Sequence, residues 1–212
     1  MKKIIYFTVL FAILSCNNNS PASEISPEDK TTTITEPAAT SAEPVRELQS
    51  VEDIKGEYSY ITGKVGSGSM DSVSFKYNCN NEKNGKVVYF TENGKVRRIT
   101  HTYNEYSHFS ATDDYFVKDG AVFFVHKRQV VWSFVDQDQT KDDITEKRFY
   151  VINSKLTECT ENKSTVISSS GKVGKPTNIS TKKTECPSFE PLSKEFDKLY
   201  NLSTQRKDLK CL

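Results

Sequence analysis

One eight-residue pattern occurs three times in the chain, and it restricts the possible fold more than any other feature. YFTENGKV from Tyr89, YFVKDGAV from Tyr115 and FYVINSKL from Phe149 align without gaps. Each has two aromatic residues, two spacers, Asn or Asp followed by Gly or Ser, one spacer and a branched aliphatic residue. Asn-Gly and Asp-Gly accept the positive φ angles of a two-residue type I′ turn, whereas the serine of Asn153-Ser154 has a steric cost there that glycine lacks. The repeat therefore predicts three β-hairpins in sequence.

Runs of β-branched and aromatic residues between turn signals add further strands, including residues 57–65 and 72–78 before the first hairpin. The expected fold is mainly β, an antiparallel meander of about eight or nine strands that forms a curved sheet or a small barrel. Only residues 191–200 predict a helix, because Leu192, Phe196, Leu199 and Tyr200 form one apolar stripe. We expect this helix to pack on the sheet or close one end of a barrel; docking to a partner is the alternative.

The turns also predict a register for the first two hairpins. Counting back from Asn93-Gly94 gives the pairs Glu92–Lys95, Thr91–Val96, Phe90–Arg97, Tyr89–Arg98 and Val88–Ile99. Counting back from Asp119-Gly120 gives Phe116–Phe123 and Tyr115–Phe124. Both faces of the second hairpin are then apolar, so we expect it to lie between other elements near the centre of the domain.

The first fifteen residues have the parts of a secretory signal peptide. Lys2 and Lys3 precede an apolar run over residues 4–14, which is shorter than the roughly 20 residues that a membrane-spanning helix needs. Ile13-Leu14-Ser15-Cys16 resembles the lipobox of bacterial lipoproteins. The resemblance implies cleavage before Cys16, a diacylglyceryl thioether on its thiol, and acylation of its amine. Two or three acyl chains make a stable membrane anchor. An ordinary secretory signal with an incidental cysteine is the alternative.

The same resemblance addresses localisation. The residue after the cysteine is Asn17, not the Asp that resembles an inner-membrane retention signal, which favours the outer membrane of the cell envelope. Residues 17–50 then contain no aromatic residue and four of the seven prolines. Such a composition predicts a disordered tether, or a segment that orders on a partner. The expected organisation is signal peptide 1–15, lipidated Cys16 with tether 16–50, β-meander 51–170 and disulfide-stapled tail 171–212.

Charge and cysteine usage narrow the class of protein. Loss of Lys2 and Lys3 with the signal peptide changes the formal net charge from +1 to −1, which gives no basic field for a nucleic acid. Apart from Cys16 there are four cysteines, Cys79, Cys159, Cys186 and Cys211. An even number in an exported chain indicates two disulfides, with three possible connectivities. Pairing Cys159 with Cys186 and Cys79 with Cys211 would staple the tail to the sheet, and this is the pairing we expect.

The best candidate for chemistry is the polar stretch HTYNEYSHFSATDD from His101. His101, Tyr103 and Glu105 alternate onto one strand face, and His108, Asp113 and Asp114 follow closely. A His, Glu, His set can bind zinc or transfer protons, although a solvent-facing strand would look equally polar. The loop DQDQTKDD starts like a calcium-binding loop, but Lys141 and Lys147 stand where Gly and Glu are needed, which favours a solvated hairpin loop.

Two main hypotheses follow, and no cofactor is predicted. The first is a lipid-anchored, non-catalytic envelope module that binds a small molecule, a glycan or an envelope protein on its aromatic-rich sheet. The second is a metal-dependent hydrolase with a site at His101, Glu105 and His108. A structural envelope protein is a third possibility. Because no reaction fingerprint such as a nucleophile elbow or a P-loop occurs, the binding module is favoured.

Overall fold

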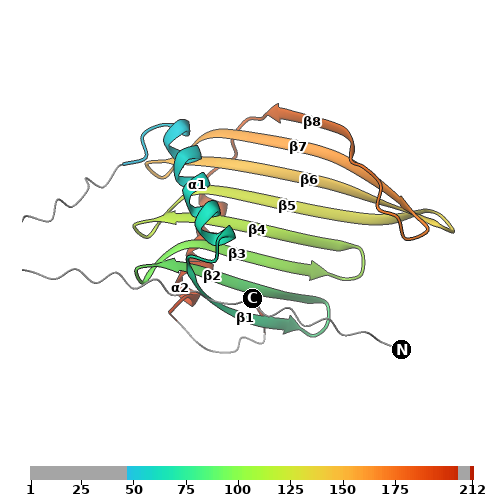
Figure 1. Cartoon of the computed structure of the whole chain (residues 1–212), viewed down its shortest axis with the longest axis horizontal. Coiled ribbons are helices and arrows are strands. Elements are labelled where there is room, and N and C mark those ends of the chain that lie inside the picture. Colours follow the sequence, from blue (N-terminus) through green and yellow to red (C-terminus); the bar gives the residue numbers. More distant parts are fainter. Residues whose placement is uncertain (1–46, 205–210) are drawn as a thin grey trace, which may run out of the picture. The chain divides into compact units, whose positions relative to one another are not determined.

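A computed structural model of the chain describes residues 47–204 and 211–212, and its centre is an open sheet of eight antiparallel strands in sequence order (Figure 1). The strands are β1 (Asp71–Cys79), β2 (Lys83–Glu92), β3 (Lys95–Glu105), β4 (Phe109–Lys118), β5 (Ala121–Asp136), β6 (Gln139–Ile152), β7 (Lys155–Ser169) and β8 (Thr177–Lys183). Helix α1 (Val51–Gly66) precedes the sheet and helix α2 (Glu190–Leu202) follows it. The predicted meander is confirmed; it is not closed, because β1 and β8 are its edges.

The predicted signal peptide, Cys16 and all of the tether up to residue 46 lie outside the described residues. At the other end of the chain, β8 pairs with β7, so the sheet continues beyond residue 170 into the predicted tail. No helix in the described part of the chain is long and apolar enough to cross a membrane.

The three repeated sequences form the β2–β3, β4–β5 and β6–β7 hairpins. Both central residues of each turn have positive φ, namely Asn93 and Gly94, Asp119 and Gly120, and Asn153 and Ser154. The predicted turns are thus confirmed, including the one without glycine. The loop DQDQTKDD is also a hairpin, in which Asp136 at the end of β5 pairs with Gln139 at the start of β6.

Each of the three hairpins contains a β-bulge three residues after its turn, at Arg97, Phe123 and Thr157. The predicted register is correct beside the first turn, where Glu92 pairs with Lys95 and Thr91 with Val96. Beyond the bulges it is wrong by one residue: the observed pairs are Phe90–Arg98, Tyr89–Ile99, Val88–Thr100, Phe116–Phe124 and Tyr115–Val125. A bulge adds one unpaired residue to a strand and increases its local twist.

The two helices cover opposite faces of the sheet at the end where these three turns lie (Figure 1). Tyr115 and Phe116 are consecutive in β4, so their side chains point to opposite faces. Tyr115 packs in the cluster that contains α2, and Phe116 packs in the cluster that contains α1. The expectation that the second hairpin lies between other elements is confirmed.

The prediction of a strand over residues 57–65 is wrong, because these residues belong to α1. Ser50 caps the helix: its hydroxyl accepts from the Asp53 amide at 3.1 Å, and Asp53 accepts from the Ser50 amide. Ile54 and Ile61 are fully buried in the cluster that contains Phe116. The ring of Tyr58 packs there too, with its centroid 4.9 Å from that of Phe116. Burial of this stripe outweighs the β-propensity of the tyrosines and isoleucine.

Replacement of Ile61 by alanine tests how much α1 contributes to the domain. Ile61 has no exposed surface, so we expect Ile61→Ala to lower the free energy of unfolding by about 3 kcal/mol. The matched control is Ser59→Ala on the exposed side of the same helix, for which we expect a change within about 0.5 kcal/mol. Urea unfolding measures both, and equal effects would contradict a structural role for α1.

The predicted C-terminal helix is α2, and it packs on the sheet. Its buried residues are Leu192, Phe196 and Leu199, and the Tyr89 hydroxyl donates to the Leu199 carbonyl at 2.8 Å. The structure contains the disulfides Cys79–Cys211 and Cys159–Cys186, which is the expected connectivity. They attach the C-terminal residues to β1 and the segment before α2 to β7.

Candidate functional site

The face of the sheet that carries α2 changes from apolar to polar along its strands. Beneath α2, Tyr89, Ile99 and Tyr115 are buried. Two residues further along the strands, His101, Asp113 and Lys127 are direct cross-strand partners in β3, β4 and β5. The register therefore places three titratable side chains side by side at the edge of the apolar core.

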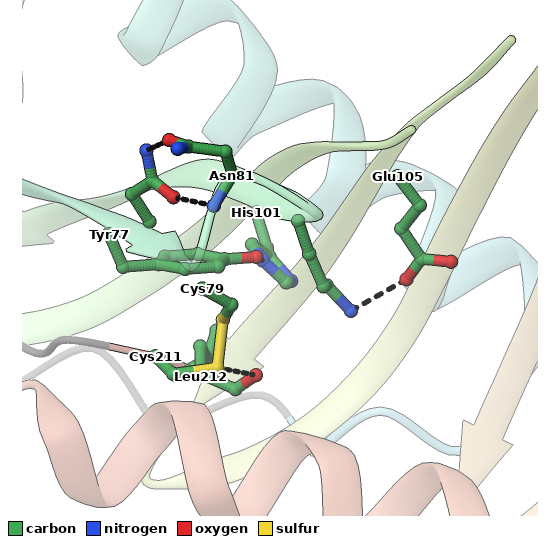
Figure 2. Close-up of a disulfide and its surroundings, with 9 residues drawn as sticks. Tyr77, Cys79, Asn81, His101, Glu105, Cys211 and Leu212 are labelled. Atoms are coloured by element: carbon green, nitrogen blue, oxygen red, sulfur yellow. Dashed lines mark hydrogen bonds and ion pairs between the residues drawn. A yellow bond between two sulfur atoms is a disulfide. The ribbon is translucent and has the colours of Figure 1, made fainter. Parts of the chain in front are cut away.

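Two of them, His101 and Asp113, line a cavity of about 160 Å³, which we call the α2-face pocket. Its lining residues come from three strands, α2 and the last described residue: Lys83, His101, Tyr103, Asp113, Tyr115, Glu195, Lys198, Leu199 and Leu212. Leu212 follows Cys211, so the disulfide to Cys79 holds it in the wall of the pocket. Figure 2 shows Leu212 and this disulfide beside the rings of Tyr77 and His101.

Aromatic rings form one side of the pocket. The His101 and Tyr103 rings stack with centroids 4.6 Å apart, and the Tyr77 hydroxyl lies 2.8 Å from His101 Nε2. Gly85 makes room for Tyr77, because a Cβ at position 85 would lie 2.7 Å from the Tyr77 ring. Burial, assisted by the positive charge of Lys83, lowers the pKa of His101 from 6.5 to about 4, so His101 is neutral at pH 7.

Asp113 is the most unusual group in the pocket. It is 4% exposed, its Oδ2 lies 3.8 Å from Lys127 Nζ, and its buried Oδ1 has no hydrogen-bond partner in the described part of the chain. Burial raises the pKa of Asp113 from 3.8 to about 6, against the opposing attraction of Lys127. A buried carboxylate oxygen without a donor is costly and rare in a folded domain.

Helix α2 supplies the second carboxylate. Glu195 accepts a hydrogen bond from the Tyr115 hydroxyl at 3.1 Å and forms an ion pair with Lys127. At the outer end, Lys83 lies 2.9 Å from Glu105 and 4.4 Å from the centroid of the Tyr103 ring. Lysine charges and carboxylates thus alternate around the aromatic rings.

Of the candidates found in the sequence, the structure brings His101 and Asp113 together. Glu105 lies on the same strand face but is paired with Lys83. His108 lies in the β3–β4 turn, where its ring packs on Trp132 with centroids 4.2 Å apart. Among residues 47–204 and 211–212, no three His, Cys, Asp or Glu side chains are grouped so that they could hold a metal ion.

Sequence reasoning missed the rest of the pocket. Tyr77 and Lys83 come from β1 and β2, and their proximity to His101 follows only from the strand register. Glu195 and Lys198 come from α2, nearly a hundred residues away in sequence, and no local pattern indicates which strand row α2 meets. A correct register would have found Lys127, because it pairs directly with Asp113.

A second cavity of about 260 Å³ lies on the same sheet face, over β5 and β6. Its lining residues are Lys127, Gln129, Thr145, Lys147, Phe149, Pro187, Ser188, Pro191, Leu192 and Glu195. Glu195 lines both cavities, and the ion pair between Lys127 and Glu195 stands where they adjoin. We call this second cavity the β5–β6 pocket.

Fold and site together define an open β-meander domain, with a helix on each face, that carries adjoining polar cavities beside α2. The chain matches no family model, no curated protein and no solved structure. The chemistry of the pocket residues is therefore the basis for a function.

Proposed function

We propose that this chain is a lipid-anchored protein of the cell envelope whose β-meander domain binds a small polar molecule in the α2-face pocket. The observation that carries the proposal is Asp113, a residue of the pocket lining whose buried Oδ1 has no hydrogen-bond donor within the described part of the chain. A ligand that donates a hydrogen bond there would offset the cost of burying the carboxylate. Stacked rings beside a few convergent polar groups are typical of small-molecule sites.

The anchor is supported by the signal-peptide pattern and the lipobox resemblance at Cys16. We expect the mature chain to carry two or three acyl chains and to sediment with membranes, mainly with the outer-membrane fraction. Cys16→Ser should move the protein to the soluble fraction, because a single lost thioether removes the diacyl group. Intact mass after detergent extraction tests this: a bare chain from wild-type membranes would contradict the anchor.

The binding role is tested with the full chain extracted in detergent. A panel of monosaccharides, disaccharides, amino acids and small amines at millimolar concentration is screened by thermal unfolding, since a ligand that binds only the folded state raises Tm. We expect at least one compound to raise Tm for the wild type and not for Asp113→Asn. A panel that shifts neither protein, or shifts both equally, would contradict a binding site at Asp113.

Acid–base catalysis is the second candidate, and the raised pKa of Asp113 is the observation that favours it. A carboxyl group with a pKa near 6 can exchange a proton with a bound substrate near neutral pH. Conversion of the bound panel compound during overnight incubation, measured by NMR, separates the two roles. An unchanged compound favours the binding module.

A further inference from the structure

The two cavities beside α2 lie on one continuous row of the sheet. Asp113, Lys127 and Lys147 are successive cross-strand partners in β4, β5 and β6. Two strand spacings of about 4.8 Å separate the first from the third, so the row runs for about 10 Å from one cavity into the other. Glu195 lines both cavities and forms an ion pair with Lys127 of this row.

Charge around this row is balanced. Four lysines, Lys83, Lys127, Lys147 and Lys198, stand against four carboxylates, Glu105, Asp113, Glu161 and Glu195. Such an arrangement has no net field to attract a simple anion or cation. It offers both donors and acceptors, which suits a ligand whose groups can act as either, and the hydroxyl group has this property.

The shapes of the two cavities add a second constraint. The rings of His101 and Tyr103 give the first cavity an aromatic side. The carbon atoms of a sugar ring can contact the ring edges there, because His101 and the Lys83 ammonium take up the faces of Tyr103. Its 160 Å³ is below the size of pockets for larger ligands, which suits a single ring. The second cavity also has an aromatic residue beside polar groups, namely Phe149 with the amide of Gln129 and the hydroxyl of Thr145.

We infer that the α2-face pocket and the β5–β6 pocket are adjacent subsites for two linked sugar rings, with the first ring beside His101 and Tyr103 and the second over Gln129 and Thr145. This inference rests on the proposed function of the α2-face pocket and specifies its ligand class. Lys127 and Glu195 would lie at the linkage between the rings, where each can exchange its partner for a hydroxyl group of the ligand.

The experiment compares monosaccharides with their disaccharides on the full, detergent-extracted chain. Glucose is paired with cellobiose and maltose, galactose with lactose, and N-acetylglucosamine with its β-1,4-linked dimer. Titration calorimetry measures each Kd. We expect one disaccharide to bind at least tenfold more tightly than its monosaccharide, because only the disaccharide reaches both cavities.

Two variants test which cavity provides the tighter binding of the disaccharide. Gln129→Ala in the β5–β6 pocket should remove the advantage of the disaccharide and leave monosaccharide affinity within twofold. Lys198→Ala, an exposed change at the α2-face pocket, should weaken both ligands several-fold. Lys194→Ala on the same helix, where the exposed Lys194 forms an ion pair with Glu190 and lines neither cavity, is the control and should change neither affinity.

The outcomes separate this inference from the proposed function. Equal affinities for a monosaccharide and its disaccharide would overturn the two-subsite inference and leave the binding module intact. Binding of an amino acid or amine without any sugar would overturn the saccharide class only. If no compound binds, both the inference and the proposed binding function fail.

Discussion

Asp113→Asn is expected to stabilise the domain at neutral pH and to remove ligand binding at the same time. The pKa of Asp113 is raised from 3.8 to about 6 by burial, and two pKa units correspond to about 3 kcal/mol. For an acid whose pKa is higher in the folded state, this cost is absent below pH 3.8, where both states are protonated. It develops as the pH rises towards 6 and is complete above it.

Asparagine has the shape of aspartate but no charge to bury. Because the amide also gives up the attraction of Lys127, we expect the free energy of unfolding to rise by about 2 kcal/mol at pH 7.5 and to differ little at pH 3.5. Urea unfolding at the two pH values measures this. Asp119→Asn is the control: Asp119 is half exposed in a turn, so its change should stay within about 0.5 kcal/mol.

Asp113→Asn should weaken ligand binding although it stabilises the fold. The asparagine amide presents one acceptor without charge, so we expect ligand affinity to fall about a hundredfold, the loss of a charge-assisted hydrogen bond. In the wild type, affinity should fall as the pH drops below 6, because protonation removes the negative charge of the Asp113 acceptor. A variant that is both less stable and fully competent to bind would contradict the role given to Asp113.

Removal of the Cys79–Cys211 disulfide is the second change with a large expected effect. Its cysteines are 132 residues apart, whereas those of Cys159–Cys186 are 27 apart. The chain-entropy relation gives roughly 5 kcal/mol for the longer loop and roughly 3.5 kcal/mol for the shorter one. We therefore expect the Cys79→Ala/Cys211→Ala variant to lose more stability in urea unfolding than the Cys159→Ala/Cys186→Ala variant.

The two disulfide variants should also differ in binding. Loss of Cys79–Cys211 releases Leu212 from the wall of the α2-face pocket, so we expect the affinity for a panel ligand to fall several-fold at a temperature where the domain is still folded. Loss of Cys159–Cys186 leaves that wall in place. Equal affinities in the two variants would show that Leu212 does not contribute to the site.

Much of the sheet could be predicted from sequence because type I′ turns have a local signature. The turn residues, the meander and the apolar central hairpin follow from the repeat that contains Asn93-Gly94 and Asp119-Gly120. The register beyond the turns could not be predicted, because bulges such as that at Phe123 satisfy packing on α1, a contact distant in sequence. An undetected bulge shifts every later pair by one residue.

Helix α1 was missed although its signal is present. Val51, Ile54, Tyr58, Ile61 and Val65 recur at spacings of three and four residues, and Ser50 with Asp53 forms a capping box. The aromatic and β-branched residues favoured a strand instead. The site was predictable only in part: alternation placed His101 and Glu105 on one face, while Glu195 depends on how α2 docks.

One sheet face has an apolar part under α2 and a polar part beside it. This division separates the residues needed for folding from those available for recognition. Side chains such as His101 and Asp113 stand outside the apolar cluster that packs α2 on the sheet. If the pocket binds a ligand as proposed, substitutions at these positions would alter recognition, while the helix-covered end would keep the domain folded. A scaffold organised in this way can diversify towards new ligands without first redesigning its core.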